Sequence, residues 1–412
     1  MSSHDDSLRS DTKVLTRGFD PSLSVGSARP AVFRSSTYVF SSPESAEHAF
    51  NIMGGRENRA PGEAVDLVYA RFNHPNAEIL EEQIVPLEDG ATSALAFNSG
   101  MAAIMTALLT FVRPGDSIVY TVPIYGGTQH LIEDFLTLFG IHGERVLAGD
   151  REQMRAVLAR AKNVRMVLIE TPANPTLIMT DIHDACEAAG QLNPKPLVMV
   201  DNTLLGPAFQ HPLLHGADLV MYSATKYLSG YSDMIGGVLL AKDPDLIRQM
   251  WGKRGLFGNI LPPDECWMLN GRLTTVGLRM RAAYDNAHQI AEALMGHPKL
   301  ERVIYPTLFA SDEQKRIFDA QCEKAGAMVS LVIKDGKRGA FEFLRRIRIA
   351  RNAVSLGGVE TLVCHPKTTT HSGFTEEEFA QAGVVDGLVR ISVGIEDWRD
   401  LLADFEQALS AV

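Results

Sequence analysis

Short apolar runs alternate with helical periodicity through the middle of this chain, from residue 66 to about residue 250. Short apolar runs bounded by turn residues predict buried strands, and apolar positions three or four residues apart predict amphipathic helices. The predicted strands are 94–97, 117–121, 166–170, 197–201, 219–223 and 237–241. The predicted helices are 101–112, 128–139, 151–160 and 182–190. Such alternation implies crossover connections, and therefore an α/β fold whose mostly parallel sheet is covered on both faces.

The pattern changes on both sides of this region. Residues 1–65 carry scattered Pro, Ser and Gly with one strand-like piece at 37–40, so we interpret them as an arm that reaches a neighbouring subunit. After a long helical stretch at 264–295, strands are predicted at 302–305, 328–333 and 388–393, and helices at 339–346, 376–382 and 397–409. We therefore expect an N-terminal arm (1–65), an α/β domain (66–263) and a C-terminal α+β domain (264–412).

Composition narrows the class of protein. The 412 residues are 45% hydrophobic and 22% charged, which is typical of a soluble globular protein with more than one core. A net charge of −11 argues against nucleic acid as a partner. The four cysteines are widely spaced with no C-x-x-C pair, and the polar N-terminus has no apolar signal sequence, so we expect no metal site and a cytoplasmic location.

One uncharged stretch, 94–112, is long enough to span a bilayer. Asn98-Ser99-Gly100 interrupts it with turn residues, so a strand, a turn and a buried helix explain it better than a membrane segment does. We expect no contact with a membrane.

Ligands of parallel α/β sheets bind beyond the carboxyl ends of the strands. Five segments end predicted strands or follow them: 99–101, 125–127, 170–175, 201–203 and 223–226. Ser99-Gly100-Met101 leads from a strand into a helix, whose free N–H groups and dipole favour an anion. No G-x-x-x-x-G-K-[ST] or G-x-G-x-x-G motif is present, so we expect a single small phosphate and not a nucleoside triphosphate or a dinucleotide.

The segment Asp-Leu-Val-Met-Tyr-Ser-Ala-Thr-Lys (218–226) places a lysine just after a predicted buried strand. The hydroxyls of Ser223 and Thr225 precede Lys226 where the chain leaves the sheet. Low-dielectric surroundings lower the pKa of a lysine, and a neutral amine can attack a carbonyl carbon. The alternative is a surface lysine after an edge strand, since most lysines are exposed.

Asp201 and Tyr125 add two further candidates. Asp201 closes an apolar run, where a carboxylate needs a cation or a ring nitrogen nearby, or else caps the following turn. Tyr125, in Ile-Tyr-Gly-Gly, is either a stacking aromatic or a core residue. A buried lysine, a strand-end aspartate, an aromatic and a helix N-terminus for one phosphate are together the groups that hold pyridoxal 5'-phosphate.

Several longer motifs resemble those of the Cys/Met metabolism family of pyridoxal-phosphate enzymes, the cystathionine γ-synthase-like group. The matching segments are Tyr125-Gly126, Glu170-Thr-Pro-Ala-Asn-Pro175, Asp201-Asn-Thr203, Ser223-Ala-Thr-Lys-Tyr227, Ser355-Leu-Gly-Gly358, Thr370-His371-Ser372 and 387–397. The resemblance implies an aspartate-aminotransferase-like (type I) fold with residues 66–263 as the cofactor-binding domain. It also implies a homotetramer of dimers with shared active sites.

The same resemblance implies roles for individual residues. Lys226 would form the Schiff base, Asp201 would pair with the pyridine nitrogen, and Asn174 would contact the phenolic oxygen of the cofactor. Tyr125 would stack on the ring and help in proton transfer. The residues implied to bind the cofactor around its phosphate are Ser99, Gly100, Met101, Ser223 and Thr225, with Tyr69 and Arg71 reaching the phosphate of the neighbouring subunit. The residues implied to clamp the substrate carboxylate are Ser355 and Arg390.

Two departures from the family pattern bear on the substrate. The usual Tyr-Ser-Arg-x-x-Asn-Pro-Thr reads here Tyr69-Ala-Arg-Phe-Asn-His-Pro-Asn76, which alters local loop contacts. Cystathionine-processing members tend to have Glu before Ser-Leu-Gly, whereas Val354 cannot meet the distal ammonium of cystathionine. Members that resemble methionine γ-lyase carry an apolar residue there, although their Cys after Tyr-Gly is Gly127 here.

We therefore expect a pyridoxal-phosphate-dependent lyase that eliminates the γ-substituent of a sulfur amino acid, of methionine γ-lyase type. The alternatives of the same class are cystathionine γ-synthase or γ-lyase, O-acylhomoserine sulfhydrylase, and a γ-lyase for a non-sulfur substrate such as canavanine. The alternative of a different class is a non-catalytic scaffold of the same fold. No G-x-S-x-G motif is present to support a serine hydrolase.

Overall fold

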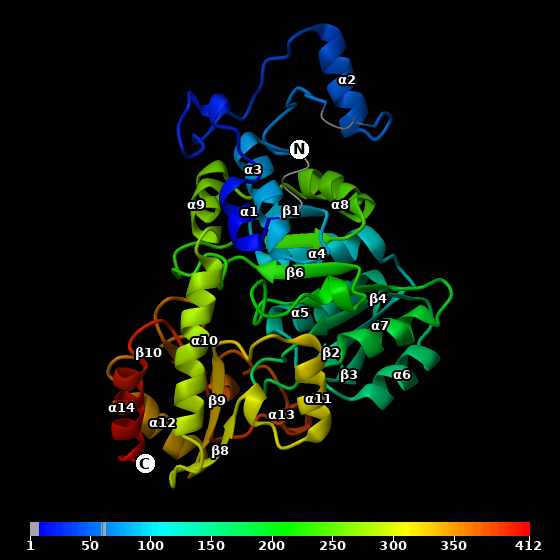
Figure 1. The fold of residues 1–412 in the computed structure, drawn as a ribbon. Coiled ribbons are helices and arrows are strands. Elements are labelled where there is room, and N and C mark those ends of the chain that lie inside the picture. The colour runs from blue at the N-terminus through cyan, green and yellow to red at the C-terminus, as the bar shows by residue number, and fades with distance from the viewer. Residues whose placement is uncertain (1–7, 59, 61–62) are drawn as a thin grey trace.

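A computed structural model describes residues 8–58, 60 and 63–412. Figure 1 shows a central sheet with helices on both sides, a second sheet near the C-terminus at the lower left, and an N-terminal segment that carries α2 (Pro43–Met53) away from the body. Within the described residues, every helix is too short or too polar to cross a lipid bilayer.

The central sheet has seven strands in the order β1-β7-β6-β5-β4-β2-β3. Their bounds are β1 (Ser93–Phe97), β2 (Ser117–Val122), β3 (His142–Leu147), β4 (Val164–Glu170), β5 (Leu197–Asp201), β6 (Leu219–Ser223) and β7 (Gly237–Ala241). The pairs from β6 through β5, β4 and β2 to β3 are parallel, whereas β7 is antiparallel to both β6 and β1. The predicted α/β class with a mostly parallel sheet is confirmed.

Alternate residues of the central strands pack on opposite faces of this sheet. In β4, Met166 and Leu168 join the apolar cluster formed with α4 and α8, whereas Val167 and Ile169 join the cluster formed with α3, α6 and α7. The bounds of these helices are α3 (Pro75–Ile84), α4 (Gly100–Phe111), α6 (Arg151–Arg160), α7 (Ile182–Gly190) and α8 (Pro244–Phe257). Burial on both faces explains why the strands read as continuous apolar runs.

All six strands predicted for this region are present, and the sequence missed only β3. Strand β3 lies at the edge of the sheet and half of its residues are exposed, so its sequence carries no apolar run. The predicted helix 128–139 is helical throughout but irregular, because α5 (Gly126–His130) continues as a π-turn and a 3-10 turn. The stretch 94–112 is β1, a turn capped by Ser99, and α4, as expected.

The second sheet has five strands in the order β10-β11-β12-β9-β8. Their bounds are β8 (Leu300–Ile304), β9 (Met328–Ile333), β10 (Arg351–Asn352), β11 (Leu362–Cys364) and β12 (Leu388–Ser392). Its helices are α10 (Val276–Ala293), α11 (Asp312–Gln321), α12 (Gly336–Arg346), α13 (Glu376–Ala382) and α14 (Trp398–Leu409). The predicted helical stretch 264–295 is two helices, α9 (Pro263–Leu273) and α10, and α9 packs against α3 of the central region. The division of the chain at 263/264 stays a prediction.

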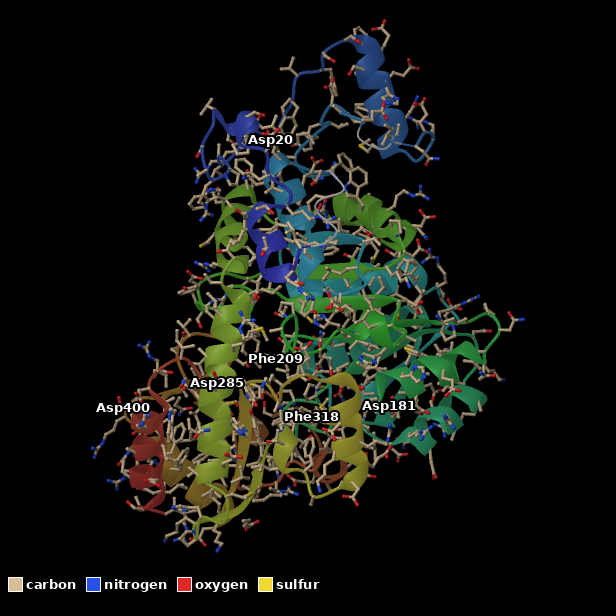
Figure 2. The ribbon with its side chains drawn as sticks, viewed as in Figure 1. Asp20, Asp181, Phe209, Asp285, Phe318 and Asp400 are labelled. Atoms are coloured by element: carbon tan, nitrogen blue, oxygen red, sulfur yellow. The ribbon has the colours of Figure 1, made fainter. Side chains whose placement is uncertain are left out.

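Contacts at two places join helices that accompany the second sheet to the central region (Figure 2). Asp181 caps α7 and also accepts a hydrogen bond from Arg316 of α11 at 2.8 Å. Phe209 packs against Tyr284 of α10, with ring centroids 5.7 Å apart. The apolar cluster on this face of the central sheet continues into β9 and β12. The two sheets therefore share one core.

The N-terminal segment contains more structure than predicted. Helix α1 (Ser10–Thr16) packs against α3. Ser42 caps α2, and Pro43 is the first residue of that helix. The strand predicted at 37–40 is wrong, because only Thr37 forms a single bridge, to Tyr69. An apolar run without a partner strand does not form a ladder.

Candidate active site

A cavity of about 370 Å³ opens at the carboxyl ends of β4, β5 and β6. Its lining includes residues from all five of the segments selected by the strand-end rule. The lining residues are Ser99, Gly100, Met101, Ile104, Tyr125, Glu170, Asn174, Asp201, Thr203, Leu204, Met221, Ser223, Thr225, Lys226, Ile235 and Leu356. The parallel strands explain this convergence, because their carboxyl ends meet at one edge of the sheet.

Lys226 follows β6 and projects into this cavity. Its Nζ donates a hydrogen bond to Ser355 Oγ at 2.6 Å, which links the central region to the loop before β11. Burial, and then the nearby charge of Arg390, lower the pKa of Lys226 to about 8, although Asp201 opposes both effects. A substantial fraction of this amine is therefore neutral near physiological pH, as a nucleophile requires.

Asp201 and Glu170 lie side by side because β4 and β5 pair in register at these two residues. Both are buried. Burial raises the pKa of each carboxyl, and the charge of Asp201 raises the pKa of Glu170 as well. Asp201 Oδ1 also accepts from the Thr203 backbone N–H at 3.0 Å, so it caps the following turn. Asp201 lines the cavity as well, and its pairing with a ring nitrogen stays a prediction.

The start of α4 forms one end of the cavity. Ser99 Oγ caps the helix by accepting from the Ala102 N–H at 3.0 Å, while the N–H groups of Gly100 and Met101 have no acceptor within the helix. The Ser223 hydroxyl lies close by, since a Cβ on Gly100 would stand 3.5 Å from Ser223 Oγ. Thr225 Oγ1 bonds both backbone groups of Gly236, at 3.1 and 3.3 Å. This end can hold a small dianion.

Arg390, on β12, connects Asn174 with Ser355. Its Nη1 donates to Asn174 Oδ1 at 3.1 Å and its Nη2 to the Ser355 carbonyl at 2.7 Å. Because Asn174 Oδ1 is engaged, the amide nitrogen is the side free to donate into the cavity. Arg390 Nε is buried without a partner, which leaves it available for a bound carboxylate.

His371 lies behind Asn174. Its Nε2 is 3.2 Å from the Asn174 carbonyl and its Nδ1 is 2.8 Å from Thr370 Oγ1. Burial and then the charge of Arg390 lower the pKa of His371 to about 4, so the imidazole is neutral at physiological pH. The ring therefore donates one hydrogen bond to hold the loop after β4.

Tyr125 stands at the start of α5, with its side chain 50% exposed. The ring folds over Gly127, because a Cβ at that position would stand 2.7 Å from Tyr125 Cε1 and 3.1 Å from Met101 Sδ. The cysteine found there in methionine γ-lyase-like members would therefore move this ring. The absence of a side chain at Gly127 therefore allows the Tyr125 ring to take its position.

Ser355 has a backbone φ of 88°, an uncommon value for a residue with a side chain. The turn it begins approaches Lys226 closely, since a Cβ on Gly357 would stand 2.6 Å from the Tyr227 nitrogen. Val354 is 54% exposed to solvent and does not belong to the cavity lining.

Ser355, Arg390 and Val354 do not line this cavity, although Ser355 and Arg390 bond to residues that do. Tyr69 and Arg71 also stand apart from it. Tyr69 is exposed, and Arg71 donates to the Gly255 carbonyl and stacks over Phe72 at 4.7 Å. Neither belongs to the described lining of the Lys226 cavity. The single chain therefore leaves them pointing elsewhere, which is compatible with a role in a neighbouring site.

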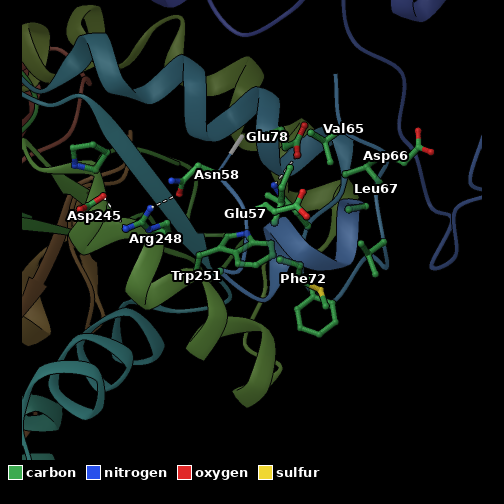
Figure 3. Close-up of a pocket in the computed structure, with 17 residues that line it drawn as sticks. Glu57, Asn58, Val65, Asp66, Leu67, Phe72, Glu78, Asp245, Arg248 and Trp251 are labelled. Atoms are coloured by element: carbon green, nitrogen blue, oxygen red, sulfur yellow. Dashed lines mark hydrogen bonds and ion pairs between the residues drawn. The ribbon is translucent and has the colours of Figure 1, made fainter. Parts of the chain in front are cut away.

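A larger cavity, of about 590 Å³, lies between the N-terminal segment and α8. Figure 3 shows Trp251 and Arg248 of α8 facing Leu67, Phe72 and the loop of Asn58, with Arg248 bonded to Asn58 Oδ1 at 3.3 Å. Among the described residues that line it there is no lysine. We refer to it as the arm cavity.

The donor set of the Lys226 cavity fits pyridoxal phosphate: a partly neutral lysine, an orphaned guanidinium nitrogen, a buried strand-end carboxylate and a helix N-terminus. The family model of Cys/Met metabolism PLP-dependent enzymes matches residues 11–410.

The chain belongs to this Cys/Met metabolism family.

Its relatives and structural neighbours include several activities. The chain is 38% identical to L-methionine gamma-lyase of Fusobacterium nucleatum, over 94% of each chain. It is 38% identical to cystathionine beta-lyase MetC of Bacillus subtilis, over 84% of this chain and 86% of that one. The crystal structure of cystathionine gamma synthase from Xanthomonas oryzae in complex with cystathionine superposes with a TM-score of 0.88 at 33% identity, covering 98% of each chain.

As a member of the Cys/Met metabolism family, the protein is a pyridoxal-phosphate-dependent enzyme of the aspartate-aminotransferase-like fold. No role was predicted for Glu170 or His371, although both belong to segments that resemble the family motifs. Glu170 closes an apolar strand in the same way as Asp201, and that signal was sufficient to select it. Thr203 and Leu356 also line the cavity, and only the fold brings Leu356 there.

Proposed function

We propose that this family member is a carbon–sulfur lyase of methionine γ-lyase type, which converts a sulfur amino acid to a 2-keto acid, ammonia and a thiol. The observation that carries the choice is Val354, an exposed apolar residue directly before the Ser355 that contacts Lys226. Val354 offers no charge to the distal ammonium of cystathionine, whereas the side chain of methionine ends in an apolar thioether. The 38% identity to L-methionine gamma-lyase is equalled by that to cystathionine beta-lyase, so Val354 alone carries the choice.

Arg390 and Ser355 bind the α-carboxylate of the substrate in this proposal. Arg390 has an unpartnered Nε, while its Nη2 donates to the Ser355 carbonyl at 2.7 Å. A guanidinium held at two of its nitrogens keeps a fixed direction, so the carboxylate binds in one orientation. That orientation presents Cα to Lys226, which lies next to Ser355.

The cofactor, when bound, supplies the electron sink for reactions at Cα. Asp201 would hold the pyridine nitrogen, and the amide nitrogen of Asn174 would donate to the phenolic oxygen. The phosphate is bound at the start of α4 by the groups proposed above: Ser99, Gly100, Met101, Ser223 and Thr225. Lys226 carries the covalent link to the cofactor in the absence of substrate.

Proton transfers complete the proposed reaction. The Lys226 amine would accept the Cα proton of the bound substrate, and its lowered pKa makes the neutral form available. Loss of a Cβ proton would then supply the electrons that expel the γ-sulfur, and one water molecule would be consumed in releasing the 2-keto acid and ammonia. The Tyr125 phenol, at the open side of the cavity, gives a proton to the departing sulfur. A γ-replacing enzyme uses the same groups and differs in whether a second nucleophile adds before release.

Tyr69 and Arg71 complete the phosphate site of a neighbouring subunit in this proposal, and the enzyme is a tetramer of such dimers. Both residues lie outside the Lys226 cavity of their own chain, and Tyr69 is exposed. The four cysteines are all unpaired, which favours a reducing compartment such as the cytoplasm.

The deciding experiment incubates the purified holoenzyme with methionine, cystathionine, O-acyl homoserines plus thiols, and canavanine, and identifies the products by mass. We expect 2-oxobutanoate and a thiol from methionine at the highest rate. Val354→Glu should raise the rate with cystathionine relative to methionine by about tenfold. The matched control is Val385→Glu, an exposed valine between α13 and β12 that is not adjacent to Ser355, which should change neither rate. Faster turnover of cystathionine than of methionine by the unaltered enzyme would refute the proposal.

A further inference from the structure

Glu170 is a buried carboxylate to which the proposed reaction gives no part. It ends β4 beside Asp201, only 5% exposed, and lines the Lys226 cavity. Two adjacent buried carboxylates repel each other, and one of them is enough for a pyridine nitrogen. Burial and the charge of Asp201 both raise the pKa of Glu170, so its ionised form is costly for the fold. The hydrogen bonds of the Glu170 carboxyl show what it does in the fold.

The two oxygens of Glu170 hold two different loops. Oε2 accepts from the backbone N–H of Tyr125 at 2.7 Å, and Oε1 accepts from the backbone N–H of Asn174 at 3.0 Å. Tyr125 follows β2, whereas Asn174 follows β4 itself. One carboxylate therefore fixes the chain positions from which the proposed stacking ring and the proposed amide donor project.

The two loops differ in how much other support they have. Asn174 is also held at its carbonyl by His371, at 3.2 Å, and at its side-chain oxygen by Arg390, at 3.1 Å. The Tyr125 ring is half exposed and begins a short helix. Its direction depends on where the backbone of residue 125 is held, so loss of the Glu170 contact displaces Tyr125 more than Asn174.

We propose that Glu170 is a positioning residue, whose carboxylate holds Tyr125 over the cavity and Asn174 at its side and which acts on the reaction only through them. This proposal rests on the roles proposed above for Tyr125 and Asn174. It does not depend on which sulfur amino acid is the substrate.

The test compares the holoenzyme with Glu170→Gln and Glu170→Ala. The glutamine keeps one acceptor oxygen and can hold only one of the two loops, and alanine holds neither. We expect the visible circular dichroism of the bound cofactor to weaken in the order wild type, glutamine, alanine. For the substrate turned over fastest, kcat should fall about tenfold in Glu170→Gln and more in Glu170→Ala.

The matched control is Asp404→Asn. Asp404 is also a buried carboxylate that accepts backbone N–H groups, from Arg348, Ile349 and Ala350 at 2.8–3.3 Å, but on α14 and outside the cavity. It should lower the thermal stability and leave both the cofactor signal and kcat unchanged. Equal losses in Asp404→Asn would show a general effect of stability and would overturn the proposal.

A double-mutant cycle separates positioning from an independent role. In a Tyr125→Phe background the phenol is already gone, so Glu170→Gln should lower kcat by less than it does in the wild-type background. A full tenfold additional loss, or an unchanged cofactor signal in Glu170→Gln alone, would contradict the proposal. The circular dichroism is measured without substrate, so this test of Glu170 does not depend on whether the enzyme is a lyase or a synthase.

Discussion

The Lys226 cavity is smaller than the arm cavity, yet it contains the more reactive groups. The arm cavity is the larger, at about 590 Å³ against about 370 Å³. The smaller one combines a lysine of lowered pKa, two buried carboxylates and a helix N-terminus. The arm cavity is lined by apolar side chains and by charged groups such as Asp245 and Arg248, which pair with each other at 3.2 Å.

The origin of each cavity explains the difference. The Lys226 cavity lies where parallel strands end, so side chains from distant parts of the chain converge on one point. The arm cavity lies where an N-terminal segment rests on α8, and its polar groups bond to one another (Figure 3). Volume alone therefore does not mark the chemistry of this molecule. Each of the following predictions tests that comparison.

The largest effect is expected at Lys226. Lys226→Ala should abolish the covalent link to the cofactor and lower kcat by at least about a thousandfold, since both the nucleophile and the base are removed. Lys195→Ala, which removes an exposed lysine paired with Asp218, should leave kcat unchanged. The checks are the visible absorbance of the denatured and native proteins and steady-state kinetics. Retention of covalently bound cofactor by Lys226→Ala would refute the assignment.

Arg71→Ala tests whether the N-terminal side serves a neighbouring site. Alone it should be nearly inactive, as Lys226→Ala should be. Mixing the two under conditions of subunit exchange should restore about a quarter of the wild-type activity, because half of the dimers are hybrids and each hybrid has one intact site. The measurement is activity against time, with exchange followed by mass. No recovery after complete exchange would argue against a shared site.

A smaller effect concerns pH. With its pKa near 8, the neutral fraction of Lys226 rises about tenfold between pH 7 and pH 9, and the rate of cofactor binding by the apo-protein should rise with it. Below pH 8 the folded state buries a charged ammonium that the unfolded chain exposes. Fewer protons are bound by the folded state between about pH 8 and the ordinary lysine pKa, so this group adds stability as pH rises through that window.

The partners of Lys226 give the control for this pH profile. Arg390 lowers the pKa of Lys226, so Arg390→Gln should move the midpoint of the binding rate to higher pH. Asp201 raises it, so Asp201→Asn should move the midpoint to lower pH. Shifts in the same direction for both variants would show that the titrating group is not Lys226.

The smallest effect is expected in the arm cavity. Arg248 is an exposed residue that pairs with Asp245 three positions earlier, an arrangement worth less than about 0.5 kcal/mol. Arg248→Ala should therefore change kcat and KM by less than about twofold and leave the visible spectrum unchanged. A tenfold loss of kcat would show that the arm cavity takes part in the reaction and that the contrast between the two cavities is wrong.

The sequence predicted the strands that form buried apolar runs, and it predicted the site segments that directly follow those strands. The strands ending at Asp201 and Ser223 are buried on both faces, so their apolar runs are unambiguous, and the residues that follow them line the cavity. Strand β3 escaped because an edge strand needs no apolar face. The strand expected at 37–40 was wrong because no neighbouring strand pairs with it.

By itself the sequence determined the cofactor chemistry, since Lys226, Asp201 and the turn at Gly100 each follow a recognisable strand and their residue types suit one ligand. Only the tertiary structure decided which residues support them. Glu170 binds Tyr125 across 45 residues and Arg390 binds Asn174 across 216, distances in sequence over which no local pattern operates. Hydrogen bonds between such residues depend on strand order and on the packing of two sheets, which are set by burial of the whole core.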